Sequence, residues 1–103
     1  MNKKIYELKT KVPKRVLYEL LAEESAELTQ ASLKYIRASG LSNNPTNISE
    51  NVAMSNLNEE INDVLLMLVI LFGQQEITLR TIKIDEYTKI ERWLKRLNDE
   101  QTN

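Results

Sequence analysis

The feature that most limits the fold of this chain is an uninterrupted apolar run, VLLMLVILF, at residues 64–72. Nine consecutive apolar residues in a helix cover its whole circumference, so no face of this segment is suited to water. A helix that crosses a membrane needs about 20 such residues, so the run is too short for that role. It predicts a helix surrounded by neighbours on all sides, in a protein that does not enter a membrane.

Most of the remaining chain also follows helical periodicity. Apolar residues from Leu17 to Tyr35 recur at steps of three and four, which predicts a helix that begins at Pro13 and ends near Gly40. The stretch 39–49 is rich in Ser and Asn and includes both a Gly and a Pro, so it is expected to be a loop. Strand patterns are weak throughout, and we therefore expect an all-α fold.

Two further helices are expected after this loop. Either Ser49 or Ser55 is suited to cap the second helix, whose body should run from about Leu57 to Gln74. Thr78 is suited to cap a third helix. The apolar stripe of this third helix is formed by Leu79, Ile82, Ile90, Trp93, Leu94 and Leu97.

The length of 103 residues predicts a single domain over 1–103, with a polar lead-in over 1–12 and a frayed tail over 98–103. A domain of this size buries only about 60–70% of the surface of its unfolded chain, so its core is modest. Three helices cannot surround the apolar run by themselves. We therefore expect a helical bundle that is completed by oligomerisation.

The composition removes several kinds of functional site. The chain contains no cysteine and no histidine, which excludes thiol catalysis, Ser-His-Asp machinery and histidine-containing metal sites. Any bound metal ion must be held by oxygen atoms, the ligands that suit Mg²⁺, Mn²⁺ and Ca²⁺. A formal net charge of −1 does not favour nucleic-acid binding. The first residues lack the apolar segment of a signal peptide, so a cytoplasmic protein is expected.

Two pairs of carboxylates occupy positions where helices should bury apolar side chains. On a helical wheel, Glu24 lies in the middle of the apolar stripe of the first helix and Glu27 lies at its edge. Glu60 and Asp63 share a face of the second helix that becomes apolar one turn later. Glu23 lies farther from the stripe than either neighbour, and we expect it to reach solvent.

These carboxylates need compensation if they are buried. An uncompensated buried charge costs several kcal/mol, and residues three apart on a helix are neighbours, so the members of each pair repel one another. Within either helix no Lys or Arg is placed to neutralise all four charges. A divalent-metal site between two facing pairs is the natural solution. A single such pair is ordinarily a solvated helix face, and that is the alternative for each pair taken alone.

The segments EESAE (23–27) and EIND (60–63) resemble the EExxE…ExxD signature of the all-α nucleoside triphosphate pyrophosphatases, a superfamily that includes MazG-like proteins. The resemblance extends over about residues 16–97 and is greatest to small single-domain MazG-like proteins. It implies an all-α fold of this type, active as a homodimer or a dimer of dimers. It also implies cleavage of a ribo- or deoxynucleoside triphosphate to the monophosphate and pyrophosphate, with Mg²⁺, or Mn²⁺ in its place, as cofactor.

By position, the resemblance makes metal ligands of Glu24, Glu27, Glu60 and Asp63. Glu23 would be a further ligand or would orient the water that attacks the α-phosphorus. The charge of the leaving pyrophosphate calls for polar and basic contacts. For these substrate contacts we select Gln30, Lys34, Lys89, Arg92 and Arg96.

Two functions of other classes stay open at this point. A non-enzymatic helical interaction module could recruit a partner through the apolar run, although it would leave the acidic pairs unexplained. A helical protein that binds nucleic acid through the basic N-terminal segment would show a salt-sensitive interaction and would tolerate the loss of Glu60.

Overall fold

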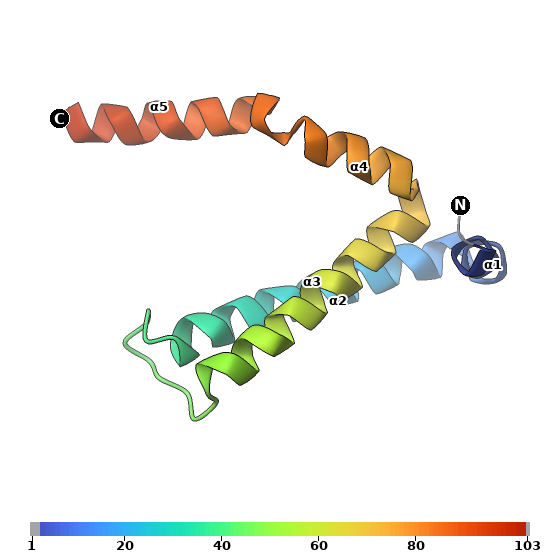
Figure 1. Ribbon diagram of the computed structural model, residues 1–103, viewed down its shortest axis with the longest axis horizontal. Coiled ribbons are helices and arrows are strands. Elements are labelled where there is room, and N and C mark those ends of the chain that lie inside the picture. Colours follow the sequence, from blue (N-terminus) through green and yellow to red (C-terminus); the bar gives the residue numbers. More distant parts are fainter. Residues whose placement is uncertain (1–2, 103) are drawn as a thin grey trace. The chain divides into compact units, whose positions relative to one another are not determined.

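The computed structural model describes residues 3–102, which form five α-helices and one short 3₁₀ helix in two compact units (Figure 1). Within the described residues there is no strand, so the predicted all-α class is confirmed. Residues 1, 2 and 103 of the predicted lead-in and tail lie outside the described residues. Unit 1 ends at Gly73 and contains α1 (Lys3–Lys11), α2 (Lys14–Ala38) and α3 (Glu50–Phe72).

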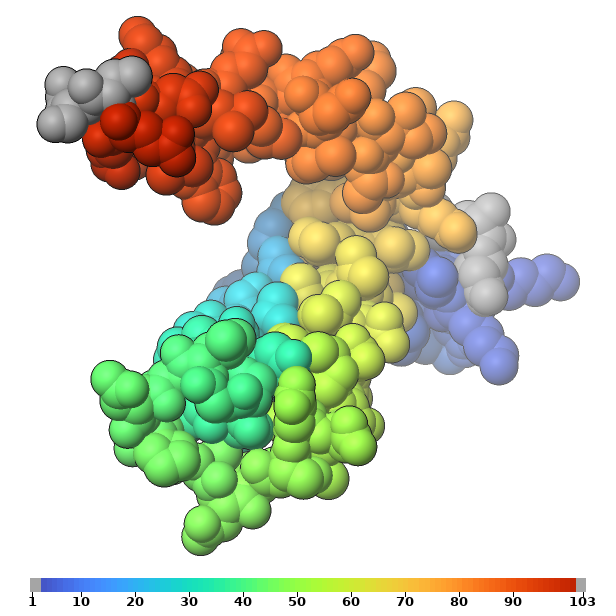
Figure 2. Space-filling model, turned by 60° about the vertical axis from the view of Figure 1, so that its left-hand side comes forward, coloured from blue at the N-terminus to red at the C-terminus, as the bar shows by residue number. Residues whose placement is uncertain are grey.

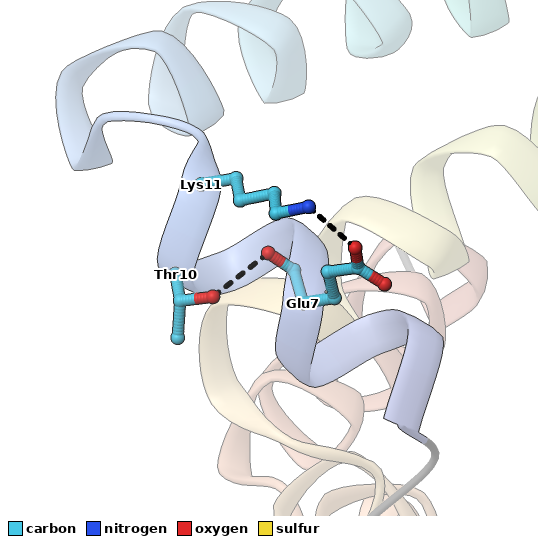
Figure 3. A network of polar contacts seen from close by, with 3 residues as sticks. All are labelled: Glu7, Thr10 and Lys11. Atoms are coloured by element: carbon cyan, nitrogen blue, oxygen red, sulfur yellow. Dashed lines mark hydrogen bonds and ion pairs between the residues drawn. The ribbon is translucent and has the colours of Figure 1, made fainter.

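The polar lead-in forms α1, a helix with an exposed polar surface. On that surface Lys11 pairs with the carboxylate of Glu7, one turn earlier, and the Thr10 hydroxyl donates a hydrogen bond of 2.9 Å to the Glu7 carbonyl (Figure 3). Ile5 and Val12 instead pack against the core of unit 1. The lead-in therefore contributes to the core rather than only preceding it.

α2 begins and ends close to the predicted positions. Pro13 precedes its first residue with a φ of −57°, which is already suited to a helix. At the other end, Gly40 has a φ of +79°, in the left-handed region that glycine adopts without a steric penalty. The Leu41 N–H donates to the Ile36 carbonyl at 3.1 Å, which satisfies one of the last carbonyls of the helix.

α3 begins earlier and ends earlier in the sequence than predicted. The Ser49 hydroxyl accepts a hydrogen bond of 3.2 Å from the Val52 N–H, so Ser49 is the capping residue and Ser55 lies inside the helix. The predicted end at Gln74 is wrong. Gly73 has a φ of +92°, which no helix continues, and α3 stops at the residue before it.

α2 and α3 form an antiparallel hairpin and carry the core of unit 1. Leu17, near the start of α2, is buried against Met67 and Ile70, near the end of α3. At the opposite end the Tyr35 hydroxyl donates a hydrogen bond of 3.2 Å to Glu50. The loop 39–49, in green in Figure 2, connects the two helices at that end.

One side of the apolar run stays uncovered within unit 1. Met67 is only 6% exposed, whereas Leu65, Leu66 and Phe72 are 42%, 46% and 42% exposed. Within unit 1, α1 and α2 cover only one side of the run, and burial of its other side by a second copy stays a prediction. No single described helix is long and apolar enough to cross a membrane, although α3 and α4 reach that length and composition as an interrupted pair.

Unit 2 corrects the prediction of a single third helix that starts at Thr78. It contains α4 (Gln74–Ile82), a 3₁₀ helix (Ile84–Glu86) and α5 (Thr88–Thr102). The interruption follows from local chemistry. One turn after Ile82, Asp85 and Glu86 occupy the positions where the apolar stripe should continue. The β-branched residues around Ile82 also have a weak preference for helix. α5 extends through Thr102, so residues 98–102 are helical where a frayed tail was expected.

Candidate metal centre

Three carboxylates from two helices converge in unit 1. Oxygen atoms of Glu24 on α2 and of Glu60 and Asp63 on α3 all lie within 4.8 Å of one another. The antiparallel pairing of the two helices causes this convergence, because it sets the middle of α2 against the middle of α3. All three side chains are half-buried. We call these three residues the acidic cluster.

Two oxygen atoms of the acidic cluster are buried without a partner. Glu24 Oε2 and Glu60 Oε2 are shielded from solvent and accept no hydrogen bond from any described residue. Burial is the main reason why the pKa of each of these two carboxyl groups is raised above the usual value for glutamate. The negative charges of Glu27 and Asp63 raise both pKa values further. The site thus favours a bound proton or a bound cation.

Neither of the two ion pairs described in unit 1 involves a residue of the acidic cluster. Lys11 pairs with Glu7, and Arg15 pairs with Glu19 at 3.3 Å. Each pair joins residues one turn apart on an exposed surface, where such pairs contribute little to stability. The described salt bridges therefore give the cluster no compensating charge.

The other two predicted carboxylates lie at the edge of this arrangement. Glu27 is exposed and is not among the three residues whose oxygens converge. Its charge nevertheless raises the pKa of both Glu24 and Glu60, which makes it a neighbour of each. Glu23 is exposed, as the helical wheel predicted. Three of the four predicted ligands thus come together, with the fourth beside them.

A pocket of about 350 Å³ adjoins the acidic cluster and shares Glu60 with it. Gln30 and Lys34, which the sequence analysis selected as substrate contacts, line this pocket. The full lining is formed by Glu27, Gln30, Ala31 and Lys34 on α2, by Ala53, Asn56 and Glu60 on α3, and by Ile48 in the loop.

The sequence analysis missed four lining residues, Ala31, Ile48, Ala53 and Asn56. A signal for Asn56 was present, since it precedes Glu60 by one helical turn and therefore shares its face of α3. No comparable signal pointed to Ile48, whose position depends on the path of an irregular loop.

The remaining predicted contacts belong to unit 2. Lys89, Arg92 and Arg96 are exposed on α5, together with Trp93, whose side chain is 60% exposed. Their assignment to substrate phosphates stays a prediction. Tyr35, in unit 1, is half-buried. This burial, followed by the hydrogen bond to Glu50, raises the pKa of its hydroxyl.

Comparison with known proteins identified no relative, because no family model, curated protein or solved structure matches the chain. The resemblance to MazG-like proteins therefore depends on the two acidic motifs and the segments around them.

Proposed function

We propose that this chain is a Mg²⁺-dependent nucleoside triphosphate pyrophosphohydrolase. It would convert a ribo- or deoxynucleoside triphosphate and water to the corresponding monophosphate and pyrophosphate. The observation that carries the proposal is the convergence of Glu24, Glu60 and Asp63 from two helices, with two buried carboxylate oxygens that have no partner. The resemblance of EESAE and EIND to the pyrophosphatase signature supplies the reaction class.

The acidic cluster suits a hard divalent cation. Its ligand atoms are carboxylate oxygens, which Mg²⁺ and Mn²⁺ prefer. The cluster oxygens lie within 4.8 Å of one another, close enough for all three side chains to contribute to one cation site. The cation would also take the place of the proton that the raised pKa values of Glu24 and Glu60 favour.

Each carboxylate has a role in this proposal. Glu24, Glu60 and Asp63 hold the cation, and Glu27 completes the set as the ligand nearest to solvent. Glu23 is a further ligand or orients the water, and a carboxylate accepts the proton that this water loses. The water oxygen bonds to the α-phosphorus as the bond from that phosphorus to the bridging oxygen breaks, and pyrophosphate leaves. A bound Mg²⁺ neutralises phosphate charge and lowers the pKa of water.

The proposal extends to the substrate contacts and the assembly. Gln30 and Lys34 contact the substrate in the pocket beside the cluster, and Lys89, Arg92 and Arg96 bind phosphates. The uncovered side of the apolar run supports an active homodimer or dimer of dimers, because a second copy would remove exposed apolar side chains from water. We also propose a cytoplasmic location, where nucleoside triphosphates are plentiful.

The test of the proposal replaces the adjacent residues Glu59 and Glu60 of α3 by glutamine, one in each variant. Glu60→Gln removes a cluster charge, whereas Glu59→Gln makes the same chemical change at an exposed position outside the cluster. Pyrophosphate release should fall at least about 100-fold in Glu60→Gln and stay near the wild-type rate in Glu59→Gln. Circular dichroism should find equal helix content in both variants. Full Mg²⁺-dependent activity in Glu60→Gln would refute the ligand assignment.

A further inference from the structure

The residues that line the pocket are arranged in order from the acidic cluster to the loop 39–49. Because α2 and α3 are antiparallel, their lining residues follow one another in matched order from the cluster toward the loop. Glu27 and Glu60 come first, at the cluster end, and Gln30 and Asn56 come next. A ligand held at the cluster by one end would therefore extend along the pocket toward the loop 39–49.

The middle of the pocket combines two carboxamides with apolar surface. Gln30 approaches from α2 and Asn56 from α3, and each carboxamide offers two N–H donors and one carbonyl acceptor. Ala31 and Ala53 are small and buried, at 7% and 2% exposure, and Ile48 adds apolar surface from the loop. A few polar groups on an apolar wall, in a volume between about 300 and 1,000 Å³, are typical of small-molecule pockets.

We propose that this pocket binds the heterocyclic base of the nucleotide, and that Asn56 and Gln30 determine which base is accepted. The inference deepens the proposed function and depends on it for the identity of the ligand. Base edges carry adjacent donors and acceptors, which carboxamide side chains pair with specifically. Base faces are apolar and match the wall formed by Ile48 and the two alanines.

Phosphate is a poorer occupant of the same space. Glu27 and Glu60 line the cluster end of the pocket, and their negative charges repel an anion that brings no cation. Among the described lining residues Lys34 is the single basic one. A triphosphate that meets the acidic cluster through a cation would leave the attached base on the loop side, beside the two carboxamides.

The test exchanges a carboxamide for a carboxylate of nearly the same size. Asn56→Asp removes the two donors but keeps the volume, and Asn58→Asp adds the same charge at an exposed position of α3 that does not line the pocket. The assay is kcat/KM for nucleoside triphosphates of each base. In Asn56→Asp the ratio between the preferred base and the others should change by about tenfold or more, and in Asn58→Asp it should not change.

Inorganic triphosphate, which has no base, serves as the control substrate. Its hydrolysis measures the effect of the added charge in the absence of a base. This effect should be larger in Asn56→Asp than in Asn58→Asp, because Asn56 lies one turn from Glu60 on the same face of α3. Equal base ratios in wild type and both variants would overturn the inference. An effect of Asn56→Asp that is as large on inorganic triphosphate as on nucleotides would also overturn it.

A second readout separates this inference from the proposed function. Nucleoside 5′-monophosphates are titrated into ¹⁵N-labelled protein, and the side-chain NH₂ signals of Gln30 and Asn56 are followed. Shifts in both signals are expected in wild type and in Asn58→Asp, even if the chain hydrolyses no triphosphate. In Asn56→Asp, which has no NH₂ group at position 56, the shift of the Gln30 signal should be reduced. If neither signal shifts up to the solubility limit of the nucleotides, the pocket does not bind a base, whatever the hydrolysis assay finds.

Discussion

A pair of neighbouring residues in α3 tests whether a second copy completes the fold. Met67 is 6% exposed in unit 1 and Leu66 is 46% exposed. Truncating each to alanine removes several apolar atoms from the same helix, one residue apart. The two variants therefore differ mainly in which side of the apolar run they affect.

The expected magnitudes follow from these exposures. Met67→Ala leaves a cavity in the core formed with Leu17 and Ile70, and such truncations cost about 2–5 kcal/mol. A fully buried leucine contributes about 1.5–3 kcal/mol. With nearly half of its side chain in water, Leu66 should contribute about half of that amount in a single copy. If a second copy covers this side, Leu66→Ala should cost as much as Met67→Ala.

The assay is urea unfolding followed by circular dichroism at two protein concentrations that differ tenfold. We expect both truncations to cost at least about 2 kcal/mol, and the wild-type midpoint to rise with protein concentration, because unfolding is then linked to dissociation. The reasoning would be refuted by a wild-type midpoint that is independent of concentration, together with a cost for Leu66→Ala of about 1 kcal/mol or less.

The remaining predictions concern the acidic cluster and a helix cap. Folding raises the pKa values of Glu24 and Glu60 above 4.5, the ordinary pKa of glutamate. Below pH 4.5 the two carboxyl groups therefore contribute to the stability of the metal-free protein, and this contribution is lost as the pH rises through the raised pKa values. Thermal unfolding at a series of pH values should find this loss, and Mg²⁺ should reverse it at neutral pH but not in Glu60→Gln. Ser49→Ala removes the hydrogen bond to the Val52 N–H and should cost about 1 kcal/mol in urea unfolding, whereas Ser55→Ala, inside the helix, should cost less.

Sequence reasoning was most successful where structure is local. The first two helices follow from apolar periodicity, and the convergence of Glu24 with Glu60 and Asp63 follows from their positions on helical wheels once the two helices are paired. The wheel carries that information because the face on which a helical residue lies depends only on its number. The antiparallel pairing itself is not contained in the wheels and is known from the structure, in which residues 39–49 connect the two helices.

The errors arose where two local preferences competed or where contacts are not local. Gly73, which directly follows the apolar run, was passed over as the end of the second helix, although its positive φ ends α3. A stripe from Leu79 to Leu97 suggested one helix, while the acidic and β-branched residues within it favoured a break, which the structure has. The contribution of Ile48 to the pocket depends on the course of a loop, which no periodicity describes.

The most direct test of the central claim measures metal binding at the acidic cluster without nucleotide. Free Mn²⁺ would be followed by electron paramagnetic resonance during titration into wild type, Glu60→Gln and Glu59→Gln. We expect saturable binding to wild type and Glu59→Gln and strongly weakened binding to Glu60→Gln. Equal binding by all three proteins, or none by wild type, would contradict a metal centre formed by Glu24, Glu60 and Asp63 and would favour a metal-independent helical interaction module.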